Sequence, residues 1–119
     1  HQDAATAPVR LYYTGWSSST GEADWGLRPL FAGDKTPPSM YNISYYKNPT
    51  VDADIMKALG TTDRAEKTKL YTEVQEEIWK DAPWAFLVTE KLLYSTSKKL
   101  TGMYVMPDAN YFFEEIDLQ

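Results

Sequence analysis

The stretch from Asn48 to Pro83, NPTVDADIMKALGTTDRAEKTKLYTEVQEEIWKDAP, decides the fold because it predicts two helices in succession. Asn48 and Pro49 form a typical helix start, since Asn caps free backbone amides and Pro suits the first helical position. Gly60 stands where a left-handed C-terminal cap is expected. The apolar residues between these signals are Val51, Ile55, Met56 and Leu59. We therefore expect the first helix to end near Gly60.

A second helix start lies at Asp63. Asp63 and Glu66 have the spacing of a capping box, with Asp in place of the usual Ser or Thr. The apolar stripe of this helix consists of Leu70, Tyr71, Val74 and Ile78, and the opposite face is mostly charged. Because Pro83 cannot continue a helix, we expect this one to end near Asp81.

The residues before Asn48 predict a strand, a loop and a short helix. Val9 to Thr14 is rich in β-forming residues that alternate between two faces, so we expect a strand that ends at Gly15-Trp16. The hydroxyl run that follows is a loop, and a short or irregular helix is expected around Leu27 to Phe31. Pro29 lacks an amide donor and is therefore expected in the first turn of that helix.

Three further strands are predicted after Pro83, at Trp84–Val88, Leu92–Thr96 and Met103–Met106. The expected order of elements is β-α-α-α-β-β-β. This order is typical of an α/β fold, with α+β as the alternative. The chain has 119 residues, which is the size of one ordinary domain.

Composition excludes several classes of function. With 12 basic and 17 acidic side chains, the net charge is −5, so binding to nucleic acid or to an anionic membrane is not expected. The chain has no cysteine, and its one histidine is His1, which excludes disulfides, thiolate chemistry and histidine-based triads. The carboxylates of Glu76-Glu77 lie on the charged helix face, where solvation explains them. We therefore expect no enzyme, no cofactor and no metal site.

The most informative candidate for a binding site is the segment from Gly15 to Trp25. Two tryptophans flank a run of small hydroxyl side chains, Ser17-Ser18-Ser19-Thr20. Flat apolar rings beside rotatable hydrogen-bonding groups suit a small polar ligand in a cleft. The alternative interpretation is that Trp16 and Trp25 are core residues and the serine run is an ordinary loop.

Several short motifs in this order resemble one family of transport proteins. They are Tyr13–Ser17, Thr20–Trp25, Ile78–Trp84, Leu100–Gly102, Met106–Asp108 and Glu114–Gln119. Together they are similar to the C-terminal part of the peptide/nickel/oligopeptide class (family 5) of ABC-importer solute-binding proteins. The resemblance covers Val9 to Gln119.

The resemblance implies a fragment of a much longer, two-lobed periplasmic binding protein. Residues 9–99 would belong to its C-terminal lobe, and residues 100–119 would cross toward the other lobe. Residues 1–8 are small and polar and would be a disordered end or a scar outside the lobe. Such a protein closes on its ligand by hinge motion.

The resemblance also implies a ligand and a transport partner. The whole protein would capture glutathione or a small peptide and present it to the permease subunits of an ABC importer. Peptide-binding members commonly place an Asp a few residues after Gly-Trp, where it pairs with the peptide's α-amine. In this chain the serine run, at about Ser19, occupies that position in place of the Asp. Its hydroxyls would donate hydrogen bonds to the carboxylates of an acidic γ-linked tripeptide. The residues expected near the ligand are Trp16, Ser17, Ser18, Ser19, Asp24, Tyr41, Asn42 and Tyr45.

A rival hypothesis is a small, self-contained domain whose exposed Tyr and Trp side chains bind a protein partner. Self-association is expected under both hypotheses, because an isolated lobe would expose a former interface. Under the first hypothesis, one lobe supplies only part of the contacts, so weak or absent ligand binding is expected for this chain alone.

Overall fold

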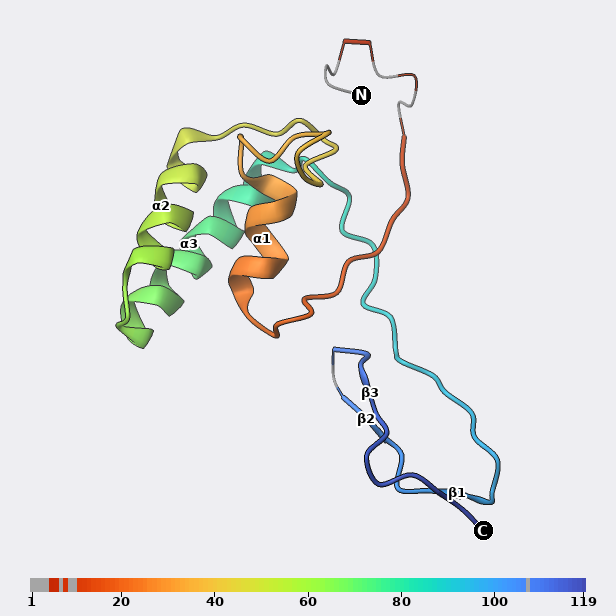
Figure 1. Cartoon of the computed structure of the whole chain (residues 1–119). Coiled ribbons are helices and arrows are strands. Elements are labelled where there is room, and N and C mark those ends of the chain that lie inside the picture. Colours follow the sequence, from red (N-terminus) through yellow and green to blue (C-terminus); the bar gives the residue numbers. More distant parts are fainter. Residues whose placement is uncertain (1–4, 7, 9–10, 107) are drawn as a thin grey trace.

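The computed structural model describes residues 5–6, 8, 11–106 and 108–119. Its elements are the helices α1 (Ala23–Phe31), α2 (Pro49–Gly60) and α3 (Arg64–Asp81) and the strands β1 (Leu100–Thr101), β2 (Tyr104–Val105), β3 (Tyr111–Phe112) and β4 (Asp117–Leu118). The helices gather at one side, and the strands lie beyond a long extended connection (Figure 1). A mixed α and β composition is confirmed, but the predicted order with a strand before the helices is wrong.

The predicted starts of α2 and α3 are both confirmed. The side chain of Asn48 accepts hydrogen bonds from the amides of Thr50, at 2.9 Å, and Val51. The carboxylate of Asp63 does the same for the first amides of α3. The end of α3 at Asp81 also agrees with the prediction. These termini follow from local capping chemistry, which the sequence displays directly.

Two details at the junction of α2 and α3 differ from prediction. Gly60 is the last residue of α2 and not a left-handed cap, because the chain turns into an extended conformation at Thr61, whose amide donates to Lys57 O at 3.1 Å. The capping box is also indirect. The Thr61 hydroxyl accepts from the Asp63 amide at 3.2 Å and donates to the Glu66 carboxylate at 2.6 Å. The short link places Thr61 between the two groups that a capping box would join directly.

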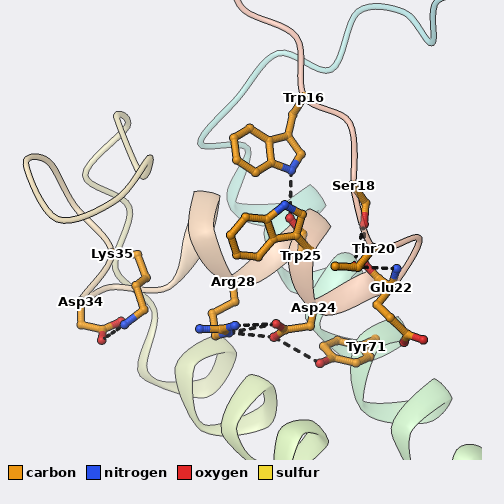
Figure 2. A network of polar contacts seen from close by, with 10 residues as sticks. All are labelled: Trp16, Ser18, Thr20, Glu22, Asp24, Trp25, Arg28, Asp34, Lys35 and Tyr71. Atoms are coloured by element: carbon orange, nitrogen blue, oxygen red, sulfur yellow. Dashed lines mark hydrogen bonds and ion pairs between the residues drawn. The ribbon is translucent and has the colours of Figure 1, made fainter. Parts of the chain in front are cut away.

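The expected short helix is α1, but Pro29 lies near its C-terminal end and not in its first turn. A proline there leaves the carbonyl of Trp25, four residues earlier, without its helical donor. The indole Nε1 of Trp16 donates to that carbonyl at 2.9 Å (Figure 2). Pro29 itself is fully buried, so its packing and this replacement donor offset the missing helical bond.

The three helices share one hydrophobic core. Its largest cluster joins the end of α1 to the inner faces of α2 and α3 and consists of Leu30, Phe31, Ala32, Val51, Ile55, Val74 and Ile78. A second cluster is formed by Ala58, Leu70 and Tyr71. The predicted apolar stripe of α3 is thus confirmed as the buried one. Every buried residue of the described part lies between Pro29 and Ile78.

Three predicted strands are wrong in the part of the chain that the structure describes. Residues 11–14, 84–88 and 92–96 run without strand pairing, while Val9 and Arg10 lie outside the described residues. Leu87, Val88 and Leu93 are exposed along this path. A strand requires hydrogen bonds from a neighbour, and an apolar β-forming sequence alone does not supply one.

Residues 100–119 form two short antiparallel ribbons. β1 pairs with β4, and β2, which falls within the predicted strand at 103–106, pairs with β3. Gly102 follows β1 at a positive φ of 76°, and a Cβ there would lie 1.8 Å from the carbonyl oxygen of Glu115. Glycine is therefore required where these two segments approach each other.

The described chain is extended in space. Its radius of gyration is 18.2 Å, whereas a compact domain of this length has about 13–14 Å. None of the helices in the described residues is long and apolar enough to cross a membrane. The division at residues 8 and 99 that the resemblance implied stays a prediction.

Candidate functional site

The hydroxyl loop, residues 17–21, is a tight turn that leads into α1. The Gly21 amide donates to Ser18 O at 3.2 Å, and Gly21 adopts a φ of 68°. The Ser18 hydroxyl donates to Glu22 O at 2.9 Å, and the Glu22 amide donates to the Thr20 hydroxyl oxygen at 3.2 Å. The loop therefore holds its own shape by local hydrogen bonds (Figure 2).

A cavity of about 420 Å³ lies between the hydroxyl loop and the turn that joins β2 to β3. The loop contributes Ser17, Ser18, Thr20 and Gly21, and the turn contributes Met106 and Asp108. In Figure 1, the segment that leads into α1 lies beside the end of the β2–β3 ribbon. This volume lies within the range of small-molecule sites, about 300–1,000 Å³. The cavity brings together residues almost ninety positions apart in sequence.

An aromatic cluster stands next to the hydroxyl loop. The ring of Trp16 lies 5.1 Å from the ring of Tyr41 and 6.1 Å from that of Trp25, centroid to centroid, with all planes tilted. Tyr41 is 52% exposed and Trp16 36% exposed, so both present ring surface to solvent. The hydrogen bond from Trp16 to the Trp25 carbonyl fixes the indole on α1. The cluster offers an apolar wall with a defined orientation.

Asp24 is engaged within the chain. Its carboxylate pairs with Arg28 through contacts of 2.7–3.1 Å, and the Tyr71 hydroxyl donates to it at 3.4 Å (Figure 2). The hydrogen bond from Arg28 to Asp24 raises the pKa of Arg28 above its ordinary value. Burial, with the negative charge of Asp24, raises the pKa of Tyr71 to about 12. Asp24 therefore ties α1 to α3, and its charge is matched by Arg28.

Asn42 is fully buried and its amide is saturated. Its Nδ2 donates to Ala32 O at 3.0 Å and to Tyr46 O at 2.8 Å, while its Oδ1 accepts from the Ser44 hydroxyl and the Tyr46 amide. Each bond holds the loop between α1 and α2 in place. Tyr45, at a positive φ of 55°, lies in the same loop.

A second polar contact joins this loop to the end of α3. The Tyr46 hydroxyl donates to Asp81 at 2.6 Å, and Asn48 Nδ2 donates to the same oxygen at 2.8 Å. These two hydrogen bonds lower the pKa of Asp81 below its usual value. Burial, reinforced by Asp81, raises the pKa of Tyr46 to about 12.

The structure brings only some of the predicted site residues together. Ser17 and Ser18 line the cavity, and Trp16 and Tyr41 form the adjacent aromatic wall. Ser19 belongs to the loop but does not line the cavity, while Asp24 and Asn42 are used in internal contacts. Sequence reasoning missed Met106 and Asp108, which come from a distant turn. Met106–Asp108 was one of the motifs behind the family resemblance, but no local pattern in the sequence placed these residues near the serines.

No group of acidic or histidine side chains suited to a metal ion occurs in the described residues. The lining is hydroxyl, carboxylate and thioether, with backbone from Gly21. Such a set can accept and donate hydrogen bonds and offer one negative charge.

Comparison with known proteins identifies a group of relatives. The chain is 61% identical over 110 residues to the Glutathione-binding protein GsiB of Pectobacterium atrosepticum, which covers 92% of this chain and 21% of that protein. It is 53% identical over 111 residues to the proteins of the same name from Escherichia coli and Salmonella typhimurium, covering 93% of this chain and 22% of theirs. No family model matches the chain.

The chain spans about a fifth of the length of these curated relatives. Their names describe binding and not a reaction, in agreement with the expectation that the chain is not an enzyme. Identity above half over nearly the whole chain leaves no room for a coincidental resemblance of motifs. The chain is therefore a homologue of the bacterial glutathione-binding proteins and corresponds to about one fifth of their length.

Proposed function

We propose that this chain supplies part of the ligand-binding cleft of a periplasmic solute-binding protein that captures glutathione, or a small peptide like it, for an ABC importer. The observation that carries the proposal is the identity of 53–61% with proteins named for glutathione binding. The site supports it, because a cavity with hydroxyl donors lies beside an aromatic wall. Glutathione carries two carboxylates that such hydroxyls can bind.

The exposed apolar segments favour the same proposal over a self-contained domain. Residues 84–96 hold Phe86, Leu87, Val88, Leu92, Leu93 and Tyr94 at the surface. A stable monomer rarely exposes so much contiguous apolar surface. In a protein about five times longer, these segments would gain strand partners and a cover. The rival hypothesis, a domain that binds a protein partner, accounts for this exposed surface but gives no role to the cavity.

Calorimetric titration with glutathione tests the proposal. The 119-residue chain is compared with a chimera in which the chain replaces the matching segment of the Pectobacterium atrosepticum protein. We expect micromolar or tighter binding by the chimera and weak or absent binding by the chain alone, since one part of the cleft cannot close on the ligand. The proposal fails if the folded chimera does not bind glutathione while the unaltered relative does. Sub-micromolar binding by the chain alone would also contradict it.

A further inference from the structure

The cavity between the hydroxyl loop and the β2–β3 turn contains one carboxylate, that of Asp108. This side chain takes part in no ion pair within the described residues. Its two oxygens accept from the backbone and side-chain amides of Asn110, at 3.2 and 2.8 Å, which fixes their direction. A carboxylate oxygen has two acceptor positions, so each can accept a further hydrogen bond.

The opposite wall offers hydroxyl groups. Ser17 makes no hydrogen bond to any described residue, so its hydroxyl is available to an incoming acceptor. Thr20 accepts from the Glu22 amide, and its own proton reaches only a 3.4 Å contact with Ser18. Hydroxyl donors and a carboxylate acceptor therefore line one cavity, and no hydrogen bond joins them to each other.

We propose that this cavity is the subsite for the zwitterionic γ-glutamyl end of the ligand, with Asp108 as the acceptor for its ammonium group. The inference rests on the proposed function. In a γ-glutamyl peptide, the ammonium and a free carboxylate are attached to the same carbon, so their partners must lie in one small site. Asp108 binds the ammonium, and the hydroxyls of Ser17 and Thr20 donate to the carboxylate. Charge-assisted hydrogen bonds of this kind are the stronger class.

This arrangement also predicts selectivity between isomers. The amino-terminal carbon of an ordinary α-linked peptide carries an ammonium but no free carboxylate, so the hydroxyls would lose their acceptor there. The ligand's thiol and glycine portions play no part in this subsite. We therefore expect the γ-linked isomer of Glu-Cys-Gly to bind more tightly than the α-linked isomer, because only the former satisfies both walls.

The test uses the chimera and two probes, glutathione and its deamino analogue, glutaryl-cysteinylglycine. Loss of one charge-assisted hydrogen bond costs about tenfold in affinity. Unaltered chimera should therefore bind the deamino analogue about tenfold more weakly than glutathione. Asp108→Asn, which keeps an oxygen for the Asn110 amide, should bind glutathione about tenfold more weakly and should no longer distinguish the two probes. Asp117→Asn, in β4 and outside the cavity, is the matched control and should behave as the unaltered chimera.

Two outcomes overturn the inference while leaving the proposed function intact. In one, the unaltered chimera binds glutathione and the deamino analogue equally, a result that needs no substitution to fold. In the other, Asp108→Asn still discriminates between the probes. Circular dichroism of each variant confirms that the helices are formed. Absence of glutathione binding by the unaltered chimera is a different result and contradicts the proposed function itself.

Discussion

Two regions of the molecule contrast sharply in how they are held together. The helical unit, residues 22–81, contains every buried residue of the described part. The C-terminal segment, residues 82–119, contains none, although it is richer in large apolar side chains. A helix satisfies its own backbone and needs only a second apolar face for its stripe. The backbone of a strand forms its hydrogen bonds with a neighbouring strand. Without such a neighbour, hydrophobic residues do not produce a core.

The largest expected effect comes from removing a core side chain in the helical unit. Ile55 is 1% exposed and lies between α2 and its neighbours in the main cluster. Ile55→Ala should reduce the free energy of unfolding by about 2–5 kcal/mol, because the surrounding core cannot fully close the space that the shorter side chain leaves. Urea unfolding followed by helical circular dichroism measures the change.

Leu93→Ala in the C-terminal segment is the matched control. Leu93 is 87% exposed, and its substitution should change the same free energy by less than about 0.5 kcal/mol. A comparable loss at both positions would show that the C-terminal segment contributes to the helical core after all.

A smaller and more local effect is expected at Gly102. An alanine Cβ there would overlap the carbonyl of Glu115, and the positive φ adds backbone strain. Gly102→Ala should abolish the pairing of β1 with β4 and leave the helical unit within about 0.5 kcal/mol of its original stability. Amide exchange by NMR reads both regions in one experiment.

Gly15→Ala is the matched substitution, since nothing lies within 4 Å of a Cβ at Gly15. It should leave both regions unchanged. Destabilisation of the helices by Gly102→Ala would mean that the ribbons and the helical unit fold as one cooperative unit and not as two independent regions.

The smallest effect concerns alkaline pH and is confined to the helical unit. Burial and Asp24 raise the pKa of Tyr71 to about 12 from its ordinary 10.0. Between these values the unfolded chain has released a proton that the folded chain retains, so stability falls as pH rises. Tyr71→Phe should flatten that fall, as measured by urea unfolding from pH 9 to 12. An unchanged slope in the variant would show that Tyr71 does not titrate differently in the two states.

The helical part of the fold could be predicted because its signals are local. Asn48, Asp63 and Pro83 each act within a few residues, and the stripe of α3 is visible as a period in the sequence. Pro29 was misplaced because the donor that compensates for it, Trp16, comes from outside the helix. Strands at 84–88 and 92–96 were predicted from hydrophobicity, which carries no information about whether a neighbour is present.

The candidate site was predictable only on one side. The aromatic and hydroxyl residues around Gly15 to Trp25 formed a recognisable group in the sequence, and the structure places Trp16 and Ser17 at an aromatic wall and a cavity. Asn42 had the right chemistry for a ligand contact, but burial assigns its amide to the loop itself.

Sequence alone determined the ends of α2 and α3, the buried stripe of α3 and the hydroxyl loop, because each depends on interactions between residues close along the chain. Only the tertiary structure decided that the apolar segments after Pro83 stay exposed and that Asp108 lines the same cavity as Ser17 and Ser18. Both depend on which distant segments meet in space. Helix capping and hydrophobic periodicity depend on residues close along the chain. Strand pairing and the opposite wall of a cavity depend on the path of the whole chain.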